Sequence, residues 1–324
     1  MLIEADKLNS ETLPELPDCR SSDFLPQLVD FGHFLENAVR PGCPFDLKQW
    51  PNLLWQKIES AMLHGFETFL GAKVPVGEVL MLQWYNSGIF VKTAEKVLGF
   101  DILPIPRYYG WPEPEGLTQR IATAVDALFV THNHQDHYDY ELVKACIGYK
   151  KPVLMHPEAA EVASGITMAE SGLRIRLGEI TVTSHHGCHV WRHQPNEVPL
   201  AYFEVGCGSY FRFVFCGDAD YTKGFSGVES RPDVLFITWR NPGPEYEDGC
   251  SEQIATTSDA VNIAISELKP CRIILQHYAE LDHIYRGFSA SYEMAVELID
   301  KLSLPTGIYF WGNVFNPLCC GCSL

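Results

Sequence analysis

The chain has 324 residues, enough for one large domain or two ordinary ones, and its 46% hydrophobic and 20% charged composition is typical of a globular protein. Its net charge of −17 disfavours nucleic acid as a substrate, because phosphate backbones are bound by Lys and Arg. The sequence contains no run of about eighteen apolar residues, so it predicts no membrane span. Residues 1–20 contain five acids, whereas a secretory signal begins with basic residues and continues with an apolar run. Eleven cysteines, several of them like Cys216 within apolar runs, favour reduced thiols and a cytoplasmic location.

Two helices are predicted ahead of the first strand, over residues 23–39 and 46–70. In the second helix apolar residues recur every three or four positions, as in an amphipathic helix; they are Leu47, Trp50, Leu54, Ile58, Met62, Phe66 and Phe69. Such a stripe must pack on another surface, either the rest of the chain or a second subunit, and we favour a homo-oligomer formed through these helices. Residues 1–76 are therefore predicted to be a helical extension ahead of residues 77–324.

Short strands alternate with helices after residue 77, which indicates a layered α/β fold. The predicted strands are 78–84, 89–93, 96–100, 127–130, 153–155, 172–177, 179–184, 201–205, 212–216, 234–237, 272–276 and 307–311. Helices are predicted over 140–147, from 157 onward, through 258–268 and through 291–302. The Pro-rich, aromatic stretch 104–116 is predicted to be irregular, either a surface loop or the wall of a binding site.

Histidine placement is the most informative feature of the chain. Eight of the twelve histidines lie between His132 and His193, and the tightest group is the run His132, His134, Asp136 and His137. Alternate residues of an extended segment point to the same side, so the first two histidines can bind one metal ion while the last two residues turn towards a second. Imidazole nitrogen and carboxylate oxygen suit zinc and neighbouring divalent ions, whereas a structural zinc site would favour cysteines.

The run from His132 to His137 resembles the His-x-His-x-Asp-His signature of the metallo-β-lactamase superfamily, and the resemblance covers roughly residues 78–311. It implies a four-layer αβ/βα sandwich, the metallo-β-lactamase fold, as the catalytic domain over 77–324. It also implies two divalent metal ions, with zinc the first choice and manganese or iron the alternatives.

The remaining metal ligands are expected from the same resemblance. Asp218, after strand 212–216, resembles the aspartate that bridges the two ions, and His277 resembles the last histidine ligand at the end of a late strand. Asp101 resembles the aspartate that ends an early strand and supports the ligand loop. The superfamily also places a histidine shortly after a strand between Asp136 and Asp218.

Four histidines compete for that last position: His185, His186, His189 and His193. The superfamily ligand stands some six residues after the end of its strand. Counted from the apolar strand that ends near Thr183, this spacing favours His189 over His185 and His186.

Within the superfamily, the pattern is most similar to the branch that contains L-ascorbate-6-phosphate lactonase and the N-acyl-phosphatidylethanolamine phospholipase D. The similar pieces are the hairpin Asn86-Ser87-Gly88, the run Thr131-His132-Asn133-His134 and the run Gly217-Asp218-Ala219-Asp220-Tyr221. This resemblance implies hydrolysis of a lactone, a phosphodiester or a related ester or amide bond in a small molecule.

The implied mechanism is attack by a metal-bridging hydroxide, because a metal ion lowers the pKa of bound water from about 15.7 to about 7. Asp136 would be both a ligand and the residue that orients the nucleophile. His283 and Tyr278 are candidates for the acid that protonates the leaving group, because they neighbour His277 in the sequence. An anionic group of the substrate could be bound by one of several arginines, namely Arg107, Arg192, Arg240 and Arg286.

Two other classes of protein remain as alternatives. One is an iron-dependent oxidoreductase of the same fold, either di-iron or a persulfide dioxygenase; di-iron reductases carry a glutamate at the position of His134, so the histidine favours hydrolysis. The other is a non-catalytic binding protein, which would be expected to have lost ligands. Here all seven positions can be filled, by His132, His134, Asp136, His137, His189, Asp218 and His277.

Overall fold

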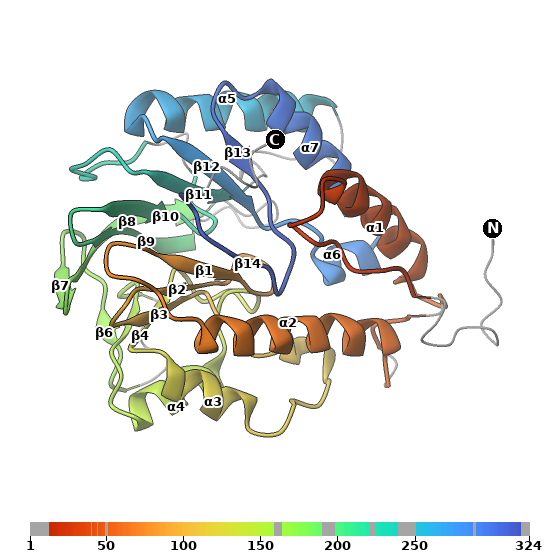
Figure 1. The fold of residues 1–324 in the computed structure, drawn as a ribbon, viewed down its shortest axis with the longest axis horizontal. Coiled ribbons are helices and arrows are strands. Elements are labelled where there is room, and N and C mark those ends of the chain that lie inside the picture. The colour runs from red at the N-terminus through yellow and green to blue at the C-terminus, as the bar shows by residue number, and fades with distance from the viewer. Residues whose placement is uncertain are drawn as a thin grey trace.

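The computed structural model describes residues 13–39, 41–43, 45–48, 51–158, 164–189, 198–220, 224–238, 251–287 and 290–318, and for residues 108 and 251–257 the backbone alone. Within these residues the strands form two sheets of seven strands each, stacked face to face (Figure 1).

The first sheet comes mainly from the first half of the chain, in the order β14-β1-β2-β3-β4-β5-β6. Its strands in chain order are β1 (Leu80–Gln83), β2 (Ile89–Lys92), β3 (Val97–Phe100), β4 (Ala127–Val130), β5 (Val153–Met155), β6 (Thr167–Met168) and β14 (Val314–Phe315). Strand β4 is buried along its whole length and pairs in parallel with β3 and β5. A continuous apolar run is what a parallel strand covered on both faces requires.

The second sheet has the order β13-β12-β11-β10-β9-β8-β7. Its strands are β7 (Arg174–Leu177), β8 (Ile180–His189), β9 (Val198–Cys207), β10 (Phe211–Phe215), β11 (Val234–Thr238), β12 (Arg272–Gln276) and β13 (Thr306–Gly307). Strands β10 to β13 are parallel, so the residues that follow β10 and β12 leave the sheet at the same edge.

An aromatic core joins the two sheets. Phe100 of β3 stacks on Phe129 of β4 with ring centroids 4.8 Å apart. From the second sheet, Phe203 lies 5.2 Å from Phe129, and Phe215 lies 5.2 Å from Phe100. Burying each ring is worth about 1.5–3 kcal/mol, so this contact fixes the strand ends of one sheet relative to those of the other.

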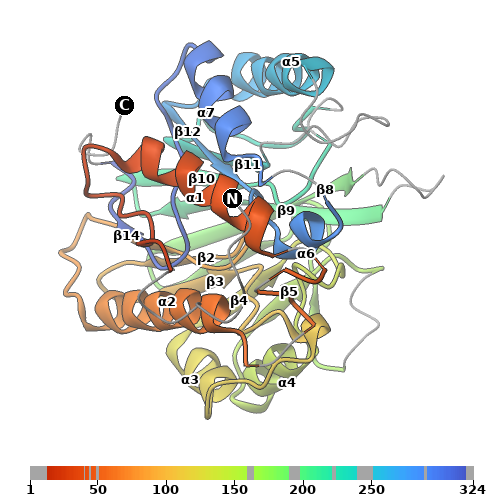
Figure 2. The same ribbon diagram turned by 90° about the vertical axis from the view of Figure 1, so that its right-hand side faces the viewer.

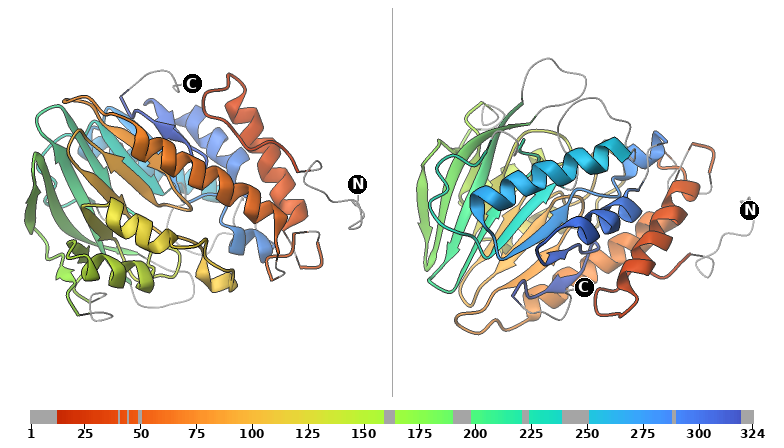
Figure 3. Two further views of the ribbon diagram at one scale, coloured as in Figure 1. Left: turned by 60° about the horizontal axis from the view of Figure 1, so that its bottom comes forward. Right: turned by 90° about the horizontal axis from the view of Figure 1, so that it is seen from above.

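Helices cover both outer faces of the stacked sheets (Figures 1 and 3). On the first sheet lie α2 (Leu53–Gly71), α3 (Leu117–Ala124) and α4 (Tyr140–Gly148); on the second lie α5 (Ser251–Leu268) and α7 (Tyr292–Lys301). Helix α1 (Phe24–Ala38) packs against α7 and the short α6 (Leu281–Tyr285), as Figure 2 shows. The predicted four-layer αβ/βα arrangement is confirmed.

The apolar stripe of α2 packs on the first sheet of the same chain. Phe66 lies 5.8 Å from Trp84 and 5.2 Å from Phe90, and Phe69 lies 6.0 Å from Phe90. The stripe is buried without a second subunit, so it gives no support to the homo-oligomer that we favoured; its predicted member Trp50 lies outside the described residues. Among the described residues, no helix has the length and apolar character needed to cross a membrane.

Several predicted boundaries need correction. Helix α2 begins at Leu53 and not at residue 46, because Asn52 caps it by accepting a hydrogen bond from Trp55 N at 3.0 Å. Strand β8 runs to His189, beyond its predicted end at residue 184, and the predicted strand 307–311 is reduced to β13. Helices α3 and α6 were not predicted, and the helix predicted from residue 157 falls largely on residues 159–163, outside the description.

Candidate metal centre

The loop between β4 and α4 carries the histidine run and is held at both ends. At its start Thr131 donates to the buried Asp101 from its backbone nitrogen and from Oγ1, both at 2.7 Å. At its end Asp139 caps α4, because Oδ1 accepts from Leu142 N at 2.7 Å, while Oδ2 accepts from Arg107 Nε at 2.6 Å. The side chains in between therefore project from a fixed backbone.

Three histidines form the first group of candidate ligands. His132 and His134 leave this loop, and His189 is the last residue of β8; one nitrogen of each lies within 4.8 Å of the others. His132 is fully buried, with Nδ1 3.0 Å from Thr131 Oγ1 and Nε2 without a hydrogen-bond partner. His189 Nδ1 is also buried without a partner. A buried polar atom without a hydrogen-bond partner lowers the stability of the fold, and a metal ion bound to these nitrogens would satisfy them.

Asp136, His137, Asp218 and His277 form the second group by the same distance criterion. His137 Nε2 lies 2.9 Å from His277 Nε2, and each of these nitrogens lies 3.3 Å from Asp218 Oδ2. Asp136 Oδ2 lies 3.3 Å from His277 Nε2 and 3.6 Å from His137 Nε2. The group thus combines two residues of the ligand loop with one residue after β10 and one after β12.

The turn after β10 aims Asp218 at both groups. Gly217 has a φ of +51°, and a Cβ there would lie 2.6 Å from Thr131 Oγ1, so no side chain fits at this position. Thr238 Oγ1 lies 2.7 Å from the carbonyl oxygen of Gly217 and 3.1 Å from Asp218 Oδ1, and so holds this turn. The other oxygen, Oδ2, lies 3.8 Å from His189 Nε2 in addition to its contacts with the second group. One carboxylate therefore stands between the two groups.

Two buried acids hold histidines of the second group from the outside. Asp101 Oδ2 lies 2.8 Å from His137 Nδ1, and Glu280 Oε1 forms an ion pair with His277 Nδ1. The other oxygen of Glu280 lies 3.0 Å from Nε2 of the partly exposed His283. A carboxylate on the outer nitrogen fixes the ring orientation and tautomer of a metal-binding histidine.

Burial and neighbouring charges shift the proton affinity of these groups in opposite directions. Burial, reinforced by His137, lowers the pKa of His132 well below 6.5. Burial also opposes charge on His137 and His277, but nearby carboxylates, with Asp218 first, outweigh it and raise both pKa values well above 6.5. Burial would raise the pKa of Asp218, yet His277 and His137 hold it well below the ordinary value. Without metal, His137 and His277 therefore favour the protonated form beside ionised carboxylates, and a divalent cation bound there would take the place of these protons.

The competing histidines His185 and His186 face other partners. His185 Nε2 lies 3.4 Å from Glu204 Oε2, and His186 Nε2 lies 2.9 Å from the carbonyl oxygen of Ala169. Of the described competitors, His189 is the one that the structure brings to the cluster, although it ends a strand and does not follow one as we expected. His193 lies outside the described residues.

The two candidates for the general acid have different surroundings. The Tyr278 hydroxyl donates to the carbonyl of Tyr309 and accepts from its backbone nitrogen at 2.8 Å. Burial raises the pKa of Tyr278, so its proton is held tightly. His283 lies behind Glu280 and is partly exposed.

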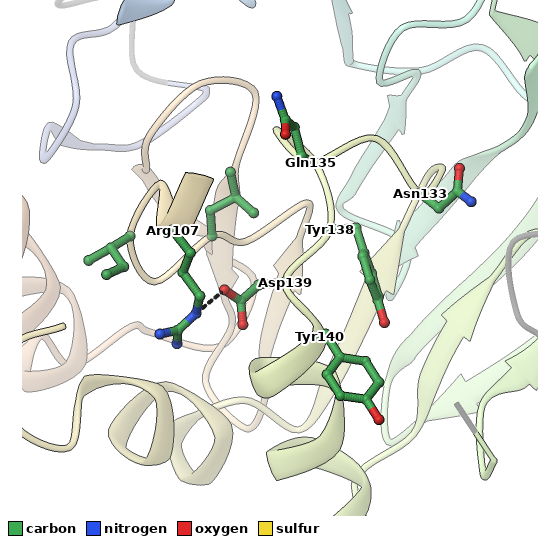
Figure 4. A pocket seen from close by; sticks show the side chains of 8 residues that line it. Arg107, Asn133, Gln135, Tyr138, Asp139 and Tyr140 are labelled. Carbon is green, nitrogen blue, oxygen red and sulfur yellow. Dashed lines mark hydrogen bonds and ion pairs between the residues drawn. The ribbon is translucent and has the colours of Figure 1, made fainter. Parts of the chain in front are cut away.

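The candidate arginines that can be described are already paired with acids. Arg107 donates to Asp139 at 2.6 Å and to Glu113 at 2.7 Å, and Arg286 donates to Asp282 at 2.6 Å. Figure 4 shows the Arg107–Asp139 pair at one side of a pocket of about 260 Å³, which is also lined by Asn133 and Gln135 of the ligand loop. Arg192 and Arg240 lie outside the described residues.

Sequence reasoning gave no role at this site to Asn86 and Ser87, although their hairpin was part of the resemblance, and it did not single out Glu280. Asn86 Nδ2 lies 3.3 Å from Asp136 Oδ2, and Ser87 Oγ lies 3.1 Å from His137 Nδ1. The only local signal for Glu280 is that it follows His277 by three positions. Nothing local indicates that the hairpin turn meets a loop fifty residues later.

Comparison with known proteins identifies the fold. No protein-family profile matches the chain. A UPF0173 protein of Pyrococcus abyssi is 29% identical over 167 residues, which is 49% of this chain and 69% of that protein.

Solved structures of similar fold include the following two. A metallo hydrolase of the archaeon Ignicoccus hospitalis has a TM-score of 0.51 and 11% identity, over 74% of this chain and 97% of that one. A possible metal-dependent hydrolase of Veillonella parvula has a TM-score of 0.50 and 12% identity, over 75% of this chain and 99% of that one. The two helix-covered sheets have the metallo-β-lactamase αβ/βα fold, as predicted.

Proposed function

We propose that this protein is a hydrolase of small molecules that binds two divalent metal ions at the ends of strands from both sheets. His132, His134 and His189 would hold one ion, and Asp136, His137 and His277 the other. The observation that carries the proposal is the position of Asp218, whose Oδ2 lies 3.3 Å from His137 Nε2 and 3.8 Å from His189 Nε2. An acid in this place can serve both ions.

The residues present fit such ions. His132 Nε2 is fully buried and has no hydrogen-bond partner, and a ligating nitrogen must be left unbonded by protein groups. The donor set of imidazoles and carboxylates suits zinc best, with manganese or iron as alternatives. Divalent ions, when bound, lower the pKa of a water molecule and polarise the carbonyl or phosphoryl oxygen of the bond to be cleaved.

The side chains of the chain itself would orient the reaction. Asp136, whose Oδ2 lies 3.3 Å from His277 Nε2, would be both a ligand and the residue that orients the nucleophile. For the general acid we favour His283 over Tyr278, because the tyrosine hydroxyl is committed to the backbone of Tyr309.

The substrate is proposed to carry a lactone, a phosphodiester or a related ester or amide bond, in line with the lactonase and phospholipase D branch. Arg107 and Arg286 are bound to acids, so an anionic substrate group would need other partners. The resemblance of the chain to hydrolases, together with His134 in place of a glutamate, supports hydrolysis over oxidation.

The proposal is tested by turnover of a panel of lactones, phosphodiesters and amides, with protein reloaded with zinc after removal of its metal. We expect hydrolysis of at least one class by the wild type and none by Asp218→Asn. The exposed Asp259→Asn on α5 removes the same charge and should leave turnover unchanged. An iron-bound protein with a visible absorption band and no hydrolysis of any class would favour the oxidoreductase alternative instead.

A further inference from the structure

The turn between β1 and β2 lies against the second ligand group, although it supplies none of the predicted ligands. Asn86 Nδ2 lies 3.3 Å from Asp136 Oδ2, 3.4 Å from the carbonyl oxygen of Asp136 and 3.4 Å from His277 Nε2. Asn86 is only 3% exposed. Hydrogen bonds shielded from water in this way are electrostatically stronger than those at the surface.

Two glutamine side chains hold this turn from either side. Gln83 Nε2 lies within hydrogen-bond distance of three carbonyl oxygens of the turn, at 3.1, 3.0 and 3.2 Å. Gln276 Nε2 donates to the carbonyl of Ser87 at 2.9 Å. Because Gln276 directly precedes His277, the turn is tied to the same strand end that presents this ligand.

The turn also directs two successive side chains at two ligands. Asn86 has a φ of +57°, a left-handed conformation that asparagine tolerates better than most residues. The next side chain, Ser87, places Oγ 3.1 Å from His137 Nδ1. The side chains of the hairpin turn therefore contact the candidate ligands directly, and the turn belongs to the ligand cluster.

Within the second group, Asp136 is the ligand that most needs such support. Its side chain is 23% exposed, against 0% for His137, 6% for His277 and 9% for Asp218. Its Oδ2 lies 3.3 Å from His277 Nε2, a separation that two atoms can have when both bind one ion at about 2.0–2.2 Å.

We propose that Asn86 is a positioning residue of the metal centre: its side-chain amide holds the Asp136 carboxylate beside His277, so that both can bind the same ion. This inference rests on the proposed function, because it assumes that the second group binds a metal ion. It adds that metal binding depends on Asn86, a residue that is not itself a ligand.

The test uses Asn86→Gly, because glycine adopts the left-handed backbone without strain while the amide is removed together with Cβ. Metal-stripped full-length protein is titrated with zinc against a chromophoric chelator, and the cobalt-loaded protein is examined by absorption spectroscopy. We expect one of the two ions to bind about 10–100-fold more weakly, with an altered cobalt spectrum, in a stripped protein that still unfolds cooperatively. The other ion should keep its wild-type affinity.

The matched control is Asn262→Ala, which removes the same amide from an exposed position on α5, outside the ligand cluster. This variant should bind both ions as the wild type does. Asn86→Asp replaces the N–H donor by an oxygen that repels Asp136, so it too should bind one ion more weakly, and it decides the question if the glycine variant does not fold.

Wild-type affinity and spectrum in Asn86→Gly would overturn the inference while leaving the proposed function intact. Tighter binding by Asn86→Asp would also overturn it, because position 86 would then be supplying a ligand and not a donor. A wild-type protein that binds no metal would remove the proposed function and this inference together.

Discussion

Three histidines of the cluster are each fixed through the same ring nitrogen. His132 uses Nδ1 towards Thr131, His137 uses Nδ1 towards Asp101, and His277 uses Nδ1 towards Glu280. In each case Nε2 is left to face the cluster. This common arrangement presets the rings as ligands, because the outer hydrogen bond decides both the tautomer and the direction of the inner lone pair.

Glu280 offers the clearest test of this arrangement. Replacing Glu280 by Gln keeps the size of the side chain but removes the negative charge beside His277 Nδ1. We expect zinc affinity to fall by about 10–100-fold, as is typical when such an outer carboxylate is lost. Competition with a chelator measures the change.

The control for this prediction is Glu297→Gln on α7, an exposed glutamate paired with Lys301 at 2.7 Å. It should leave zinc affinity unchanged. Equal affinities for wild type, Glu280→Gln and Glu297→Gln would show that Glu280 plays no part in the site.

At the scale of elements, the backbone of α2 lies very close to that of the loop before β14. A Cβ at Gly65 would lie 2.2 Å from the carbonyl oxygen of Gly312. The same loop includes Tyr309, whose backbone binds the Tyr278 hydroxyl next to His277. Helix α2 and the last strands therefore restrain one side of the metal centre.

Gly65→Ala should destabilise the protein by about 1–3 kcal/mol, because the added methyl group forces the helix or the loop to move. Gly71→Ala, at the end of the same helix, meets nothing within 4 Å and should be neutral or stabilising by up to about 1 kcal/mol. Urea unfolding of both variants measures the difference. A Gly65→Ala protein as stable as Gly71→Ala would contradict the close approach.

Elements with strong local patterns were predicted well from the sequence. The apolar run of β4 and the apolar stripe of α2 are local signals, and both elements form. Strand β8 was predicted too short because its last residues, His185 to His189, are not apolar; they are buried or half-buried through contacts with other parts of the chain. The predicted boundary between residues 76 and 77 stays a prediction, although α2 shares its apolar core with the sheets.

The candidate site could be predicted only as far as its residues carry a spaced motif. The run from His132 to His137 and the positions of Asp218 and His277 resemble a known pattern, and the structure brings these side chains together. Asn86 lies in the hairpin that supports the resemblance, but no pattern gave it or Glu280 a role at the site, because both meet their partners through the fold. A single asparagine or glutamate near a turn is common in any sequence.

On the scale of the whole molecule, the candidate metal centre lies where the two sheets meet. Its candidate ligands follow β4 in the first sheet and end or follow β8, β10 and β12 in the second. Binding of ions should therefore stabilise the folded chain as a whole, because the site exists only when both halves are packed.

This coupling predicts that the difference in melting temperature between metal-loaded and metal-stripped protein depends on pH. In the stripped protein the pKa values of His137 and His277 are raised, so their stabilising effect is full below 6.5 and is lost as pH rises through the raised values. Metal binding needs neutral imidazoles and so strengthens as pH rises. The melting temperature of loaded protein should exceed that of stripped protein by more at about pH 8.5 than at about pH 6.5.

Calorimetry on both forms at the two pH values checks this prediction. Groups outside the cluster titrate alike in both forms, so their contributions cancel in the difference. A gap that narrows as pH rises would contradict the assignment of these two histidines to the metal centre.

The most direct test of the account is the number of zinc ions bound by the stripped chain, measured by equilibrium dialysis and plasma emission spectroscopy. The account predicts two ions for the wild type, one tightly bound ion for His189→Ala, and two for His186→Ala, whose ring is bonded to the carbonyl of Ala169. A wild-type chain that binds no zinc, or a His189→Ala chain that still binds two ions with unchanged affinity, would contradict it.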